Sequence, residues 1–298
     1  MAITENMEYV NVPGGFTNLQ TYDGGGSEIP LLYIHGGPGG NCESFKPMAR
    51  RLAEKRKVYL YNQLGSDDTS STGEEFLWTP ERYVEALGKV IEHIGAPKLH
   101  LLGRSWGALL ATKHVLDTPD SPVVSITMMS PYLSTAIWVR DAKTRLAEMG
   151  PEAVKTVEEG EGSDHFDEKA FKDVIMEYNL RYQCREMDAW SDDSRLKRAV
   201  RPKTATGMKV YRHMWGPGEF TCTGIMKDID ITARLSEIKL RVMFLLGEYD
   251  QVLPTTCEYY RSLIPGSRIA VIPGASQTQF IENEDIFFSV ITQFLNGF

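Results

Sequence analysis

A serine set between glycines, after an apolar run and before a helical one, most strongly limits what this chain can fold into. Residues 98–116 read KLHLLGRSWGALLATKHVL and contain the pattern G-x-S-x-G, with Ser105 at its centre. The glycines allow a turn so tight that the serine side chain stands exposed, and the following helix aims its first N–H groups at it. A chance glycine and serine turn is the alternative, but a strand before and a helix after favour a nucleophile.

Apolar runs alternate with helical patterns through the first 130 residues. The runs PLLYIHG, KVYLYNQ, KLHLLGRS and VVSITMMSP are apolar on both faces, as in the buried strands of a parallel sheet. Between the second and third, residues 79–96 have helical spacing, with Thr79 placed to cap the helix and Pro80 in its first turn. The earlier runs EYVNVP and FTNLQTY predict an antiparallel hairpin. This order predicts an α/β protein with a mostly parallel sheet.

The strand pattern stops near residue 131 and resumes after residue 235. Helical, charged and aromatic segments dominate between these points, and EEGEGSD predicts a solvent-exposed break. The strand runs RVMFLLGEYD and SRIAVIPG follow, and an amphipathic helix closes the sequence. We therefore expect a core from residues 1–130 and 236–298 and a helical cap from residues 131–235. The cap should lie above the carboxyl edge of the sheet, where α/β proteins bind ligands.

Composition narrows the partners of the chain. A net charge of −8 disfavours nucleic acid and mildly favours a small cationic partner, such as a substrate with a free amine. No apolar run approaches 18 residues, and the first residues carry no basic and apolar leader, so we expect a cytoplasmic protein with no membrane partner. The four cysteines lack disulfide or zinc spacing and are expected to be reduced. No cofactor or metal pattern occurs, and the oligomeric state is left open.

A glycine-rich turn follows the first of the buried strand runs. Residues 35–40 read HGGPGG, and such a turn lets backbone N–H groups point at a developing oxyanion. The N–H groups of Gly37 and Trp106 are the donors that this pattern predicts. His35 ends the strand run directly before the donor loop, so we expect it to be structural.

An acid and a glutamine stand where the remaining members of a catalytic triad would be expected. Asp250 lies in a turn after the strand run that follows the insertion, and the chain order serine, acid, base is one that enzymes use. The base should then come after the next strand, in GASQTQF, where Gln277 stands. Its amide has no basic nitrogen and cannot take the Ser105 proton. It can still form hydrogen bonds that hold Ser105 and Asp250 in position.

The histidines offer little in place of that base. We expect His93, His100 and His114 at surface or edge positions, while His165 lies in the acidic break. His213, in VYRHMWGPGEF, is the one remaining candidate.

At this point the sequence resembles the proline iminopeptidases, also called prolyl aminopeptidases, of the α/β-hydrolase superfamily. The resemblance runs through nearly the whole chain, and its most specific pieces are HGGPGG, YNQLGS, GRSWG, SPYLSTAIWVRDA, MWGPGEFTCTG, KDIDIT and GEYDQVLP. It implies the α/β-hydrolase fold, a mostly parallel central sheet with an inserted helical cap. It also implies a serine aminopeptidase that releases an N-terminal residue, preferably proline, from short peptides or amides without a cofactor.

The resemblance also implies roles for individual residues. Ser105 would be the nucleophile, Asp250 the orienting acid and position 277 the base, with Gly37 and Trp106 as oxyanion donors. Glu219, in WGPGEF, would bind the free amino terminus of the substrate through a charge-assisted hydrogen bond that blocked peptides cannot make. The alternative interpretation is that Glu219 is an ordinary surface residue of the cap. Three further residues are predicted to contact the substrate: Gly36, Glu248 and Gln251.

Three positions depart from the pattern of this family. Gln277 replaces the histidine, Gln251 replaces a glutamate that members often carry as a second amine anchor, and Asn62 replaces the aspartate of YDQLG. The first puts catalysis in doubt, and the second puts a strict preference for proline in doubt. Three interpretations therefore stay open: a base replaced deliberately to trap substrate, a natural non-catalytic relative that binds peptides or amides, and an active relative such as an amino-acid amidase or a natural-product tailoring hydrolase.

Overall fold

The computed structural model describes residues 2–66, 78–162, 167–186 and 204–297. Its strands are β1 (Thr4–Val12), β2 (Gly15–Asp23), β3 (Glu28–Ile34), β4 (Arg56–Tyr61), β5 (Leu99–Arg104), β6 (Val123–Met129), β7 (Arg241–Gly247) and β8 (Arg268–Ile272). Its helices are α1 (Lys46–Leu52), α2 (Pro80–Ile94), α3 (Trp106–Asp117), α4 (Thr135–Ala147), α5 (Pro151–Gly162), α6 (Glu168–Tyr182), α8 (Ala205–Met214), α9 (Pro254–Leu263), α10 (Gln279–Glu282) and α11 (Glu284–Leu295), with short 3-10 helices at Glu43–Phe45 and Thr232–Glu237.

The eight strands form one sheet in the order β1-β2-β4-β3-β5-β6-β7-β8. The β1–β2 and β2–β4 pairs are antiparallel, and every other neighbouring pair is parallel. This confirms the predicted hairpin and the mostly parallel sheet. Because β3 and β5 are parallel neighbours, their carboxyl ends bring the HGGPGG turn beside Ser105.

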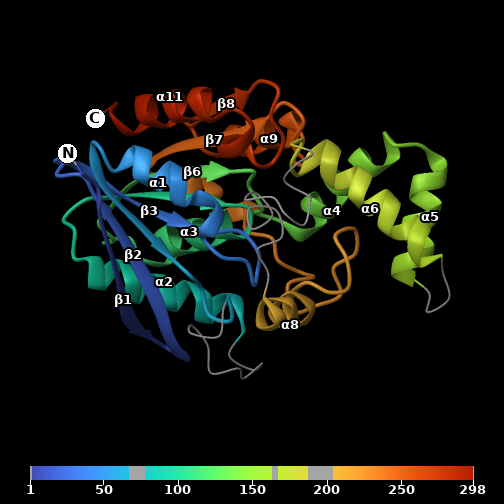
Figure 1. Cartoon of the computed structure of the whole chain (residues 1–298), viewed down its shortest axis with the longest axis horizontal. Coiled ribbons are helices and arrows are strands. Elements are labelled where there is room, and N and C mark those ends of the chain that lie inside the picture. The colour runs from blue at the N-terminus through green and yellow to red at the C-terminus, as the bar shows by residue number, and fades with distance from the viewer. Residues whose placement is uncertain (1, 67–77, 163–166, 187–203, 298) are drawn as a thin grey trace.

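Helices cover both faces of the sheet (Figure 1). α2 and α3 contribute apolar side chains to one buried cluster, and α1 and α11 contribute to the cluster on the other face. α2 begins and ends as its sequence predicts: the Thr79 hydroxyl accepts a hydrogen bond from the Arg82 N–H, and Gly95 adopts a left-handed φ of 62° at the end. The central strands are therefore buried on both faces, as their continuous apolar runs require.

In the described part of the chain between β6 and β7 lie the α-helices α4, α5, α6 and α8. α5 and α6 lie at the end of the molecule opposite the β1–β2 hairpin (Figure 1). Together with α4 they enclose a separate apolar cluster that includes Leu146, Val157, Tyr178 and Phe220. The observed insertion agrees with the helical pattern, while the division into a core and a cap at residues 131 and 235 stays a prediction.

The expected break at EEGEGSD is wrong for its first five residues, because α5 continues to Gly162. Gly160 leaves space for Phe171 of α6, whose ring atom Cδ2 would lie 2.2 Å from a Cβ at that position. Glu161 is also used, since its Oε1 accepts a hydrogen bond from the Phe220 N–H at 3.2 Å. Packing between helices therefore prevails over the low helix propensity of the two glycines. The last two residues of the motif lie outside the described residues.

Candidate active site

Ser105 stands at the turn between β5 and α3 in a backbone conformation that non-glycine residues rarely adopt. Its φ is 50° and its ψ is −116°. The turn is fixed by hydrogen bonds from the Ser105 N–H to the Met129 carbonyl, at 2.9 Å, and from the Ala108 N–H to the Ser105 carbonyl, at 2.8 Å. Gly107 is required here, because a Cβ would lie 2.1 Å from the Ile34 carbonyl oxygen. Strain of this kind commonly accompanies a functional side chain.

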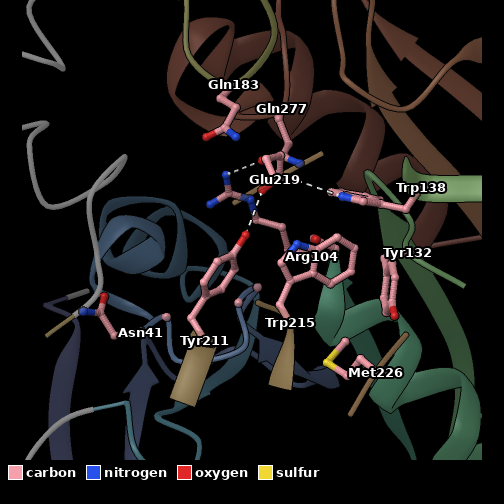
Figure 2. A pocket seen from close by; sticks show the side chains of 14 residues that line it. Asn41, Arg104, Tyr132, Trp138, Gln183, Tyr211, Trp215, Glu219, Met226 and Gln277 are labelled. Carbon is pink, nitrogen blue, oxygen red and sulfur yellow. Dashed lines mark hydrogen bonds between the residues drawn. The ribbon is translucent and has the colours of Figure 1, made fainter. Parts of the chain in front are cut away.

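A pocket of about 120 Å³ opens beside Ser105. Figure 2 shows the side chains that surround it, which come from the ends of β3 and β5, from the insertion and, for Gln277, from the turn after β8. Its lining consists of Gly36, Gly37, Gly40, Asn41, Arg104, Ser105, Tyr132, Trp138, Gln183, Tyr211, Trp215, Glu219, Met226 and Gln277. The structure therefore brings the predicted nucleophile, the glycine turn, Glu219 and Gln277 to one place.

The glycine turn has little room for side chains. Gly37 has a φ of +148°, and a Cβ there would lie 2.8 Å from the backbone nitrogens of Gly39 and Gly40. Trp106 begins α3 directly after Ser105 but does not line the pocket with its side chain, whose indole nitrogen donates to Gln63 Oε1 at 2.8 Å. The geometry agrees with backbone N–H donors beside Ser105, and the assignment of Gly37 and Trp106 as oxyanion donors stays a prediction.

Glu219 is held in the pocket by three hydrogen bonds from different parts of the chain, of which Figure 2 shows those from Trp138 and Tyr211. Trp138 Nε1 donates to Oε1 at 2.8 Å, Gln251 Nε2 donates to the same oxygen at 2.9 Å, and the Tyr211 hydroxyl donates to Oε2 at 3.1 Å. An ionised carboxylate offers about four acceptor positions, so three donors leave capacity for a ligand ammonium. Gln251 therefore acts behind Glu219 and does not itself line the pocket.

Glu248 does not join this group. Its side chain is exposed, and Oε2 accepts a hydrogen bond from the Gly274 N–H at 2.9 Å, away from the pocket lining. The turn after β7 buries Asp250 and Gln251 and leaves Glu248 in solvent. The prediction of Glu248 as a substrate contact is therefore not supported by its position.

Asp250 is completely buried and fully hydrogen-bonded. Its Oδ2 accepts from the Ser130 hydroxyl at 2.7 Å, from Gln279 Nε2 at 2.8 Å and from the Gly247 N–H at 3.2 Å, and Oδ1 accepts from the Val252 N–H at 3.1 Å. Burial raises the pKa of this carboxyl to about 6, against the lowering effect of the hydrogen bonds.

Gln277 lines the pocket but does not supply the expected bridge to the acid. Its Oε1 lies 3.5 Å from Arg104 Nη2, and its backbone N–H donates to the Tyr182 carbonyl at 3.2 Å. The side-chain amide that bonds Asp250 belongs to Gln279, so the prediction that Gln277 holds Asp250 in position is wrong. Sequence reasoning missed Gln279 and Arg104. The only available signals were a second glutamine two residues later and a cation directly before Ser105.

The family model for the alpha/beta hydrolase fold matches residues 29–284. A proline iminopeptidase of Heyndrickxia coagulans is 32% identical over 291 residues, covering 97% of this chain and 98% of the relative. The chain belongs to the proline iminopeptidase family of α/β hydrolases. A proline iminopeptidase of Clostridium botulinum is 25% identical, with 91% of each chain covered. The crystal structure of the Mycobacterium smegmatis proline iminopeptidase is also similar, with a TM-score of 0.86, 25% identity and 97% of each chain covered.

The crystal structure of VinJ shares the fold, with a TM-score of 0.87, 23% identity, and coverage of 97% of this chain and 98% of VinJ. Among the described residues no helix is both long and apolar enough to cross a membrane, and no group of three or more potential metal ligands occurs.

The described histidines of this proline iminopeptidase family member lie outside the pocket lining. The surface or edge positions expected for His100 and His114 are wrong, because both side chains are buried. His100 forms a hydrogen bond with the Ser125 hydroxyl, and His114 forms one with the Ser121 hydroxyl. Burial lowers the pKa of His100 to about 3 and that of His114 to about 4. His35 is buried and accepts a hydrogen bond from the Gln63 N–H, as a structural residue would. His213 packs against Trp78, and His93 is exposed. His165 lies outside the described residues.

Proposed function

We propose that this chain binds short peptides or amino-acid amides with a free amino terminus, in a serine aminopeptidase site that prefers proline. The observation that carries the proposal is the position of Glu219. This carboxylate is held by three donors in the same pocket as the strained Ser105. The family supports the same reading, since its matched curated relatives are proline iminopeptidases.

In this proposal Ser105 Oγ attacks the carbonyl carbon next to the amine that Glu219 holds, and backbone N–H groups of Gly37 and Trp106 stabilise the oxyanion. The serine proton needs an acceptor as the new bond forms. Gln277 has no basic nitrogen, so the proton has no base to receive it. The proposed consequence is binding with strongly impaired hydrolysis.

The surroundings of Asp250 favour a site adapted to the absence of a histidine. In a triad, the acid accepts a hydrogen bond from the base, and removal of the base alone leaves a buried carboxylate short of a donor. Here Gln279 supplies such a donor at 2.8 Å. This supports the second candidate, a natural relative that binds peptides or amides without hydrolysing them.

Binding is tested by calorimetry of the unaltered chain with prolylglycinamide and its N-acetylated form. The free amine should bind at least tenfold more tightly, because a hydrogen bond to a charged group contributes about 1.5 to 3 kcal/mol. Glu219→Gln keeps the shape of the side chain and should abolish the difference. Equal affinities of the two ligands for the unaltered chain would exclude an amine-binding site.

Catalysis is tested by restoring the base. Gln277→His should increase hydrolysis of a prolyl arylamide, because loss of a triad base typically costs about 10⁴ to 10⁶ in kcat. Gln279 competes for Asp250, so the double variant Gln277→His, Gln279→Ala should exceed Gln277→His. Gln279→Ala alone is the matched control and should stay inactive. An increase of less than tenfold in both histidine variants would contradict the assignment of position 277.

A further inference from the structure

Arg104 is a cation in the pocket that the proposed mechanism does not use. It is the last residue of β5 and directly precedes Ser105, and its side chain lines the pocket. The guanidinium lies over the ring of Phe280, 5.5 Å from its centroid, and reaches Gln277 Oε1 at 3.5 Å. No salt bridge within 4 Å joins it to a carboxylate among the residues that the structure describes.

These contacts, together with an interaction with the Tyr33 hydroxyl, leave part of the hydrogen-bonding capacity of Arg104 available. A guanidinium has five N–H donors in a planar fork, and a contact at 3.5 Å is at the limit of a hydrogen bond. A purely structural arginine would be expected to satisfy more of these donors on carboxylates or carbonyls. The side chain is only partly buried and lines the pocket, where a ligand can reach it.

The pocket therefore carries opposite charges. Within its described lining, Arg104 is the one basic side chain and Glu219 the one carboxylate. Figure 2 shows both groups directed into the same space, with Glu219 held by Trp138 and Tyr211 and Arg104 beneath Gln183 and Gln277. A ligand that matches this arrangement has a positive group at one end and a negative group at the other. Bidentate pairing with a carboxylate is what the arginine fork fits best.

We propose that the preferred ligand of this site is a free dipeptide, with its amine on Glu219 and its terminal carboxylate on Arg104. This inference rests on the proposed function and specifies its substrate class. An extended dipeptide spans roughly 7 Å, so both of its charged ends fall within one small pocket. Because Arg104 adjoins Ser105, its charge lies next to the carbonyl that the serine would attack. A longer peptide or an amide has no carboxylate at that distance from its amine.

Calorimetry of the unaltered chain with prolylglycine and prolylglycinamide tests this directly. Prolylglycine should bind about 10- to 150-fold more tightly, as expected when a charged hydrogen-bonded pair is gained. Chromatography of the mixture after each titration shows whether the dipeptide stays intact. Equal affinities, or tighter binding of the amide, would overturn the proposal without any variant.

Two variants at position 104 assign the preference to a residue. Arg104→Gln removes the charge and should bring prolylglycine to the affinity of prolylglycinamide, while binding of the amide changes little. Arg104→Lys keeps the charge and should retain part of the preference. A preference that survives in Arg104→Gln, with the far-ultraviolet circular dichroism unchanged, would place the carboxylate elsewhere and overturn the proposal.

Glu219→Gln separates this inference from the function on which it rests. If both ligands bind the unaltered chain equally and both weaken in Glu219→Gln, the amine site stands and the role of Arg104 fails. If neither ligand binds, or Glu219→Gln changes neither affinity, the proposed function itself fails.

Discussion

At the scale of single residues, the ionisation of Asp250 gives a stability prediction. Its pKa is raised from 3.8 to about 6 by burial, so between these values the folded chain holds a proton that the unfolded chain releases. The stability contributed by the protonated form is present below about pH 4 and is lost as the pH rises through 6. At about 1.4 kcal/mol for each pH unit between the two values, the loss is about 3 kcal/mol.

Asp250→Asn has no carboxyl to titrate, so its free energy of unfolding should not show this loss. Urea unfolding of both proteins at pH 4 and pH 7.5 measures it, because all other titrating groups cancel in the comparison. The variant should gain roughly 2 to 3 kcal/mol relative to the unaltered chain between the two pH values. Parallel pH profiles would show that the carboxyl titrates normally.

Residues of the candidate site could be predicted from the sequence only where the neighbouring residues determine where the side chain lies. Ser105 follows from its glycines and flanking elements, and Glu219 follows from a resemblance carried by its neighbours. Gln279 and Arg104 could not be assigned, because their roles depend on contacts across 29 and 173 positions of the chain. Glu248 was predicted as a substrate contact, but the short turn after β7 directs Asp250 inward and leaves Glu248 exposed.

At the scale of elements, α8 and the glycine turn touch backbone to backbone. A Cβ on Gly207 would lie 2.2 Å from the Gly39 carbonyl oxygen, and one on Gly39 would lie 2.1 Å from the Gly207 oxygen. Gly207→Ala should therefore displace α8, with an overpacking cost of about 1 to 3 kcal/mol. Tyr211 lies one turn later on α8, so affinity for a free amine should fall as well.

Urea unfolding and calorimetry with prolylglycinamide measure the two effects of Gly207→Ala. Gly162→Ala is the matched control, because it lies at the end of α5, where no atom of the described residues lies within 4 Å of a new Cβ. The control should leave affinity unchanged and stability equal or slightly higher. Unchanged affinity in Gly207→Ala would show that α8 does not position Glu219.

The elements themselves were largely predictable, for reasons visible in particular residues. Continuous apolar runs mark the buried strands, and Thr79 and Gly95 mark the two ends of α2. The helix α5 was interrupted too early in the prediction, since Gly160 is explained only by Phe171 of the next helix. The burial of His100 also depends on a residue outside its own strand, because its ring forms a hydrogen bond with Ser125 of the neighbouring strand.

At the scale of the whole molecule, the helices α4, α5 and α6 share an apolar cluster that is separate from those of the sheet and much smaller. The cluster of α4, α5 and α6 contains seven buried residues, whereas the sheet is packed by large clusters on both faces. Fewer buried contacts allow opening at lower free energy. Amide hydrogens of α5 should therefore exchange at least tenfold faster than those of β5, as measured by hydrogen exchange with mass spectrometry. Equal protection of α5 and β5 would show one cooperative unit.

The hydrogen bond from Trp138 to Glu219 makes the pocket its own optical probe. An ammonium that arrives at this carboxylate changes the electric field at an indole whose Nε1 lies 2.8 Å from Oε1. Trp215 also lines the pocket, while Trp78 and Trp106 are buried within the fold. Tryptophan emission should therefore shift as the site fills, and Trp138→Phe should remove most of that signal. Libraries of unlabelled amines and peptides become searchable by fluorescence on a chain that need not turn any of them over.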